Sequence, residues 1–144
     1  MPIKPENRAR YPADWPAISA AKRKRAGNRC EWPGCGAKQY SVGVWQLGAT
    51  GSFTWLALWG DNSLPRTYSE ARAIAAEMDG PADSTPPLVI VLTVAHRDHQ
   101  PENVADDNLA VWCQRHHLAY DQDHHTQTAY MTRRARANNL ELPL

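Results

Sequence analysis

Histidines are the residues of this 144-residue chain whose placement first suggests chemistry. All six fall between residues 96 and 125, together with one of the three cysteines. They are His96, His99, His116, His117, His124 and His125. Imidazole binds transition metals and transfers protons near neutral pH, so this crowding is typical of a metal site, an acid–base site, or both.

Two pairs of side chains have the spacing of zinc ligands. Cys30 and Cys35 flank the turn CEWPGC, and Cys113 and His116 are separated by two residues. Structural zinc sites are commonly built from two such pairs, one on a tight turn and one at the start of a helix. An odd number of cysteines also disfavours a disulfide framework. The sequence predicts a structural zinc site at these four residues, and the alternative is three thiols that bind no metal.

The elements that must position these residues follow from local patterns. The stretch ADWPAISAAKRKRAGN predicts a helix that Asp14 caps and Gly27 ends. The apolar run at residues 88–95 predicts one buried strand, and residues 109–112 predict a second short strand after a polar loop. From Cys113 to about Arg136 the pattern is helical. The expected order here is strand, loop, strand, helix.

The middle of the chain, residues 39–86, has the character of an insertion. VGVWQL and FTWLALW predict two strands joined as a hairpin by GATGS. A helix should begin at Thr67, with Glu70 completing a capping box, and end at Gly80, before the loop PADSTPP. No catalytic constellation is evident in this segment, so we expect it to serve as scaffold or specificity element.

Composition and charge limit the class of protein. The length and the 42% hydrophobic content fit one globular domain. No run approaches the ~18 apolar residues of a membrane span, and the N-terminus has no hydrophobic signal region, so we expect a cytoplasmic protein. Residues 1–38 hold nine Lys and Arg against three Asp and Glu.

Two basic patches could bind a polyanionic partner. Their members are Lys22, Arg23, Lys24, Arg25, Arg133, Arg134 and Arg136. For either patch alone, a solvated helix face is an equally good interpretation.

The stretch VLTVAHRDHQPENVADDNLAVWCQRHHLAYD, with the lead-in YPADWPAISA and AGNRCEW, resembles the HNH endonucleases. It resembles especially the small phage and prophage members with an AH-x-x-H loop, an NL pair and a terminal C-x-x-[CH]-H-x-x-x-D. The resemblance covers about half of the chain and leaves out residues 39–86. It implies an α+β fold in which a structural zinc staples a treble-clef-like ββα-metal finger, with an N-terminal helix and a hairpin-plus-helix insertion.

The same resemblance implies one nuclease domain over residues 1–144. Its parts would be a basic helix and zinc knuckle at 1–38, the insertion at 39–86, the ββα-metal core at 87–137 and a tail at 138–144.

The resemblance also assigns roles to site residues. His96 would be the general base, Asn108 would steady the loop, and His117 would bind the catalytic divalent cation. Asp121 lies four residues after His117 on the same helical face, so it qualifies as a second ligand. A carboxylate there favours Mg²⁺ or Mn²⁺, while the imidazole tolerates Ni²⁺ or Zn²⁺.

One position departs from the family pattern. Many HNH enzymes carry Asp immediately before the base, whereas this chain has Ala95. His99 or Asp98 from the loop could supply the missing ligand, and we favour His99 because the AH-x-x-H pattern contains it. His124 and His125 could extend the site, but two exposed helix histidines are the preferred interpretation.

The leading hypothesis is a metal-dependent endonuclease that cuts or nicks duplex DNA, leaving 5′-phosphate and 3′-hydroxyl ends. The basic patches would then grip neighbouring phosphates. The resemblance also implies phage packaging or mobile-element partners, and a bacterial or phage-infected cell. The rival hypothesis is a non-catalytic zinc-finger module that binds nucleic acid or protein and carries a degenerate HNH site, which Ala95 favours. A zinc hydrolase acting on a small molecule is disfavoured because it would need an open three-ligand site.

Overall fold

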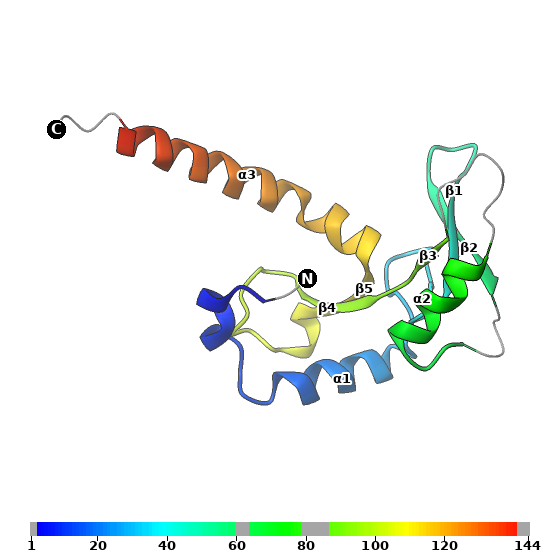
Figure 1. Cartoon of the computed structure of the whole chain (residues 1–144). Helices are drawn as coiled ribbons and strands as arrows, with labels where there is room; N and C mark the ends of the chain where they lie inside the picture. The colour runs from blue at the N-terminus through cyan, green and yellow to red at the C-terminus, as the bar shows by residue number, and fades with distance from the viewer. Residues whose placement is uncertain (1–2, 60–63, 79–86, 141–144) are drawn as a thin grey trace.

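The protein has a mixed α+β arrangement with two small sheets, seen in a computed structural model that describes residues 3–59, 64–78 and 87–140 (Figure 1). One sheet has the strand order β2-β1-β3 and the other pairs β4 with β5. The elements are η1 Pro5–Arg10, α1 Trp15–Arg25, β1 Val42–Leu47, β2 Phe53–Trp59, α2 Tyr68–Glu77, β3 Leu88–Val89, β4 Leu92–His96, η2 Asp106–Asn108, β5 Leu109–Cys113 and α3 Gln114–Leu140.

The predicted helix before the knuckle is present as α1, and it packs against β4 and β5. Asp14 occupies the N-cap position but its side chain makes no cap hydrogen bond, and Pro16 stands in the first turn. The helix ends just before Gly27, whose φ of 70° lies in the left-handed region that glycine adopts most easily. Trp15 and Ile18 pack against the main core, so α1 covers the sheet that leads to the histidines.

The inserted hairpin is confirmed: β1 and β2 pair antiparallel over the two predicted strands. A bulge between Val42 and Gly43 brings the Gly43 backbone against β2, and a Cβ built at Gly43 would lie 2.1 Å from the Leu56 carbonyl oxygen. Any side chain at position 43 would clash with the β2 backbone, so glycine is the residue that fits there.

Helix α2 begins as predicted at its N-cap, Thr67. The Thr67 hydroxyl accepts a hydrogen bond from the Glu70 backbone N–H (3.2 Å). The Glu70 carboxylate accepts from the Arg66 N–H (2.8 Å), one residue earlier than the capping box predicts. The predicted helix end at Gly80 and loop residues 81–86 lie outside the described residues.

The single strand predicted over residues 88–95 is wrong, because this segment contributes to both sheets. β3 pairs with β1, whereas β4 pairs with β5. Between them the Gln114 amide accepts from the Val91 N–H (3.0 Å) and donates to the Val89 carbonyl (2.7 Å). Gln39 likewise accepts from the Leu92 N–H (2.6 Å). Two side-chain amides thus satisfy the backbone where the chain passes from one sheet to the other.

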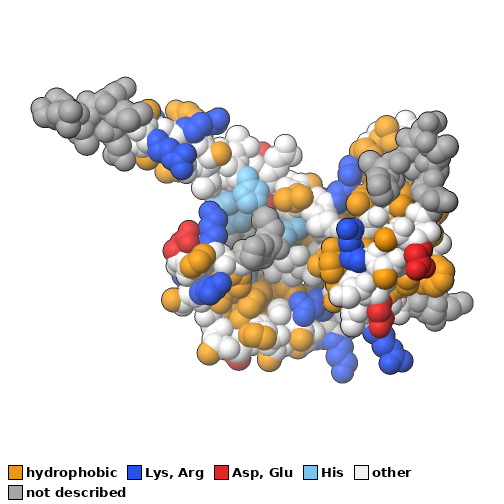
Figure 2. Space-filling model, in the orientation of Figure 1, with side chains coloured by type: hydrophobic (Ala, Val, Ile, Leu, Met, Phe, Trp, Pro, Cys, Tyr) orange, Lys and Arg blue, Asp and Glu red, His pale blue; other side chains and the backbone are white. Residues whose placement is uncertain are grey.

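Helix α3 is longer than predicted, since it continues past Arg136 and includes residues 138–140 of the expected tail. The first two turns pack against β4 and β5, and from 122 to 137 every residue is exposed. Figure 1 shows this part of α3 projecting away from the body, and Figure 2 shows Lys and Arg side chains along it. No helix within the described ranges has both the length and the apolar character needed to cross a bilayer.

Candidate functional site

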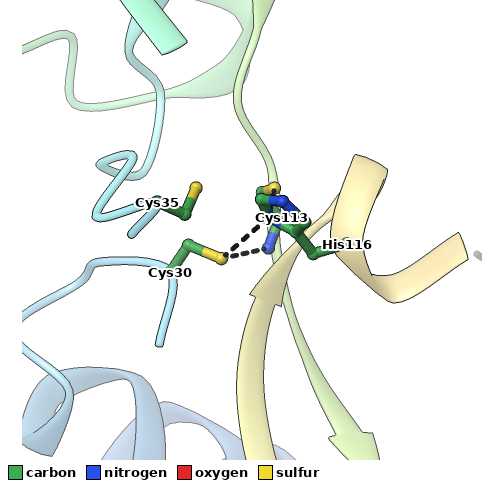
Figure 3. A group of neighbouring side chains, drawn as sticks. All are labelled: Cys30, Cys35, Cys113 and His116. Carbon is green, nitrogen blue, oxygen red and sulfur yellow. Dashed lines mark hydrogen bonds between the residues drawn. The ribbon is translucent and has the colours of Figure 1, made fainter. Parts of the chain in front are cut away.

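The four predicted zinc ligands come together in one group (Figure 3). Their ligand atoms, three Sγ and one imidazole nitrogen, all lie within 4.8 Å of one another. Cys30 and Cys35 lie on the knuckle turn, Cys113 ends β5, and His116 lies in the first turn of α3. Three sulfurs and one imidazole are the donor set of a structural zinc site. The group could therefore hold a metal such as zinc.

The knuckle is held in place by backbone hydrogen bonds. The Cys30 N–H donates to the Ala37 carbonyl (2.8 Å), and the Cys35 N–H donates to the Trp32 carbonyl (3.0 Å). Glu31 fastens the turn to β5, because its N–H donates to the Val111 carbonyl (2.7 Å) while its carboxylate accepts the Val111 N–H (2.8 Å). The two cysteines of the turn are thus fixed against the strand that carries the third.

The sulfur atoms form a hydrogen-bonded set around Cys30. Donation from the thiols of Cys113 and Cys35 holds the pKa of Cys30 far below its usual range, despite its burial. The same hydrogen bonding to Cys30 raises the pKa of Cys113. The Cys113 backbone N–H also donates to Cys30 Sγ (3.3 Å). Thiolate is the form of cysteine that binds zinc, so the surroundings favour a metal-binding state at Cys30.

Tryptophan rings fix the imidazole of His116. Trp32 stacks on it, with centroids 5.0 Å apart and planes 3° apart, and Trp45 meets it edge-on at 5.7 Å. Trp45 belongs to β1, so the insertion forms part of the wall of the Cys/His group. The sequence could not predict this contact, because Trp45 and His116 lie far apart along the chain.

A second group of polar side chains gathers around Asp121. Its residue is only 8% exposed, and its carboxylate lies 2.9 Å from His117 Nε2 and 3.5 Å from His99 Nδ1. His125 Nε2 lies 3.9 Å away. These residues line a pocket of ≈ 580 Å³. Figure 2 shows histidine side chains at the surface where the projecting helix meets the body.

The two groups differ in geometry. Within the described residues, only the Cys/His group has all its ligand atoms within 4.8 Å of one another. Around Asp121 the imidazoles converge on the two carboxylate oxygens from different sides. His116 and His117, although adjacent, belong to different groups, as the helical period predicts.

His99 reaches Asp121 from the loop in a conformation that non-glycine residues rarely adopt. Its φ is 57°, and its N–H donates to the His96 carbonyl (3.2 Å). Its ring stacks on His124, with centroids 4.2 Å apart and planes 7° apart. Such backbone strain persists where surrounding contacts enforce it, and functional sites are common among these places.

His96 ends β4 inside an aromatic enclosure. Its residue is 9% exposed, Trp15 stacks on its ring at 4.8 Å, and Tyr11 meets it edge-on at 5.6 Å. Its Nε2 is buried and has no hydrogen-bond partner among the residues that the structure describes. Burial lowers the pKa of His96, against the opposing influence of nearby carboxylates. Burial thus favours the neutral form of the ring, which lines the same pocket as Asp121.

Asn108 lies beneath the loop rather than in the pocket. Its side-chain amide donates to the Asp98 carboxylate (2.9 Å) and to the Asn103 carbonyl (2.8 Å), and it accepts from the Asp98 N–H (3.2 Å). These bonds fix the turn that carries His99. Ala95 lines the pocket without a ligand atom, at the position where the resemblance to HNH enzymes would lead one to expect Asp.

The predicted basic patches have different surroundings. Lys22 and Arg25 contact the Asp106 carboxylate at 3.4 and 2.7 Å, so they tie α1 to the loop. Arg133 lines a groove of ≈ 830 Å³ between α3 and the hairpin, and it is exposed together with Arg134 and Arg136. For Arg23 and Lys24 the described residues provide no ion pair. The role of both patches in DNA binding stays a prediction.

One feature of the pocket was missed by sequence reasoning. It is the aromatic cover of His96, for which the four-residue spacing of Tyr11 and Trp15 was the available signal. His125, which the sequence offered as an extension of the site but which we interpreted as an exposed helix histidine, lies one helical turn beyond Asp121 and lines the same pocket.

Compared with known proteins, the chain matches no family model, no curated protein and no solved structure.

Proposed function

We propose that this protein is a metal-dependent HNH endonuclease that hydrolyses DNA phosphodiester bonds, with β4, the following loop, β5 and α3 as its ββα-metal finger. The observation that carries the proposal is one pocket lined by both His96 and the Asp121 group. Phosphodiester hydrolysis requires a base for the attacking water and a positive centre for the phosphate. The pocket offers residues for both tasks.

His96 is the proposed general base. Because burial lowers its pKa, its ring is neutral at physiological pH and can take a proton from water. Trp15 and Tyr11 fix the plane of the ring. Asn108 holds the loop that begins immediately after His96, which keeps base and ligands in one arrangement.

His99, His117 and Asp121 are the proposed holders of the catalytic ion, which we expect to be Mg²⁺, Mn²⁺, Ni²⁺ or another divalent metal. They fit such an ion because a buried carboxylate lies within 3.5 Å of two imidazole nitrogens. A bound ion would supply positive charge to the phosphate and to the departing 3′ oxygen. In this proposal, zinc at the Cys/His group has a structural role: it would link the knuckle after α1 to β5 and α3, which carry residues of the pocket.

The alternative is a non-catalytic zinc-finger module that binds nucleic acid or protein. Ala95 favours it, since a methyl group stands where many HNH enzymes have a ligand. The enclosed, neutral His96 opposes it, because a purely structural zinc site does not require such a residue.

A plasmid-nicking assay separates these functions. We expect the zinc-loaded protein to relax supercoiled DNA when Mg²⁺, Mn²⁺ or Ni²⁺ is added, leaving 5′-phosphate and 3′-hydroxyl ends. His96→Ala should lower the rate by about 10²–10⁴-fold, the contribution typical of a general base, with zinc content unchanged. A wild-type protein that retains one tight zinc per chain and is inert with every ion would instead support the binding module.

A further inference from the structure

We infer that His125 is a further ligand of the ion at Asp121, and that the resulting set of three imidazoles and one carboxylate selects Ni²⁺, Co²⁺ or Zn²⁺ over Mg²⁺. This inference rests on the proposed catalytic-metal site and goes beyond it in assigning a residue and an ion class. Neither follows from the family resemblance, which ends at Asp121.

The helix geometry aligns the three residues that α3 contributes. His117, Asp121 and His125 are spaced by four residues, so they lie one turn apart along one face. Their side chains line the same pocket. His99 approaches this face from the loop, which gives the site ligands from two elements.

Each imidazole lies at a distance from the carboxylate that suits a shared ion, and the three imidazoles, which approach from different sides, would turn toward a common centre to bind it. Two ligands bound tetrahedrally at about 2.0–2.1 Å are about 3.3 Å from each other. The Asp121 oxygens lie 2.9, 3.5 and 3.9 Å from the nitrogens of His117, His99 and His125. The longest separation belongs to His125, whose side chain is 50% exposed and can therefore turn inward without displacing the core.

The charge of Asp121 gives an independent reason for a cation. A buried carboxylate is costly unless a positive partner compensates it. Among the residues that the structure describes, the side chains in ion-pair distance of Asp121 are three histidines, with no Lys or Arg. A divalent cation would compensate the buried charge and use the imidazoles as ligands at the same time.

The donor set decides the class of ion. Mg²⁺ binds oxygen ligands in strict octahedral geometry, whereas imidazole suits nickel, copper, zinc and iron. Three nitrogens and one carboxylate therefore favour an imidazole-preferring ion. His124 is the natural comparison, because it stacks on His99 at 4.2 Å and forms no ion pair with Asp121 in the described structure.

The test is a calorimetric titration of Ni²⁺ into the full-length protein carrying one zinc per chain, without DNA, with zinc content measured before and after. We expect one additional Ni²⁺ per chain, unaffected by millimolar Mg²⁺. Loss of a residue that only supports a ligand typically weakens metal binding about 10–100-fold, so His125→Ala should raise the dissociation constant by at least tenfold. The matched control His124→Ala should change it much less.

Equal effects of the two variants, or displacement of Ni²⁺ by Mg²⁺, would overturn the inference. If Asp121→Ala abolishes Ni²⁺ binding while His125→Ala leaves it intact, the metal site of the proposed nuclease stands and only the role of His125 is lost. Failure of the nuclease itself has a different signature. DNA would then remain uncut with every ion, whatever the calorimetry shows.

Discussion

His96 shows how distant residues determine the chemistry of a single side chain. Its imidazole ends a buried strand, yet the rings that enclose it come from the N-terminal segment. Arg10 helps to hold that segment in place, because its guanidinium donates to the Glu102 carboxylate at 2.7 Å. The neutral state of His96 thus depends on Tyr11 and Trp15 as well as on its own strand.

Replacing Trp15 by Ala should raise the pKa of His96, because water would reach the ring and relieve the desolvation that lowers it. The acid limb of the pH–rate profile should then move to higher pH, since a base with a higher pKa is protonated sooner as the pH falls. The unfolded chain has the ordinary histidine pKa, so His96 binds protons more weakly in the folded state. The free energy of unfolding therefore falls on acidification, as the pH drops from the unfolded-state pKa of His96 to its lower folded-state pKa. This pH dependence should weaken in the variant.

Two measurements check this expectation: an NMR titration of His96 and the pH dependence of kcat/KM for nicking. Trp32→Ala is the control, because Trp32 stacks on His116 and not on His96. An unchanged His96 titration in Trp15→Ala would show that the aromatic cover does not control the base.

Among the elements, the hairpin depends most on one backbone position. Gly43→Ala should destabilise the protein, because the added methyl group would lie 2.1 Å from a backbone oxygen of β2 that cannot move aside independently. Overpacking of this kind costs about 1–3 kcal/mol or more. Gly48→Ala is the matched control, since its nearest atom would be 3.2 Å away. Urea unfolding of both variants measures the difference, and equal midpoints would contradict the proposed role of the bulge.

The hairpin also shows which elements a sequence can predict. The runs VGVWQL and FTWLALW and the GATGS turn between them placed β1 and β2 correctly, because strand-forming residues and turn residues are local signals. The division of residues 88–95 between two sheets was not predictable, because it depends on Gln39 and Gln114, which lie elsewhere in the chain. The Cys/His group was predictable from spacing alone. The enclosure of His96 was not, because the covering rings come from a distant segment.

At the scale of the whole molecule, α3 joins two environments. Its first turns hold the proposed metal-site residues against the sheet, and Arg115 stacks over Phe53 of the hairpin with its guanidinium carbon 3.7 Å from the ring centroid. Beyond Asp121 the helix has no buried residue up to 137. Isolated helices are marginally stable in water, so the outer half should open more readily than the inner half.

Hydrogen exchange should reveal this difference along α3. Amides of 124–137 should exchange much faster than those of 117–121 and of β5, since tertiary packing protects only the latter. If Arg133 and Arg136 contact DNA phosphates, binding of duplex DNA should slow the exchange of the backbone amides around them. Uniform protection along the free helix would instead indicate that the outer half is covered in solution.

The Cys/His group holds together segments that no disulfide joins, and its cysteines are all free. Zinc there would link the knuckle after α1 to β5 and α3, which together carry the pocket. Structural zinc sites supply about 10–16 kcal/mol, comparable to or larger than the roughly 5–15 kcal/mol net stability of a domain. Chelation should therefore unfold much of the molecule rather than merely open a turn.

We expect zinc removal to abolish the cooperative thermal transition and to expose Trp32, which stacks on the proposed ligand His116, and Trp112, which packs on Trp32. Far-UV circular dichroism and tryptophan fluorescence, followed with zinc content, measure both effects. Cys35→Ser should lower the melting temperature in the same direction, because oxygen replaces one sulfur ligand. Re-addition of zinc should restore the wild-type transition but not that of the variant. An apo-protein that melts at the temperature of the zinc-loaded form would mean that hydrophobic packing alone holds the two segments together, and the zinc would then have no part in stabilising the fold.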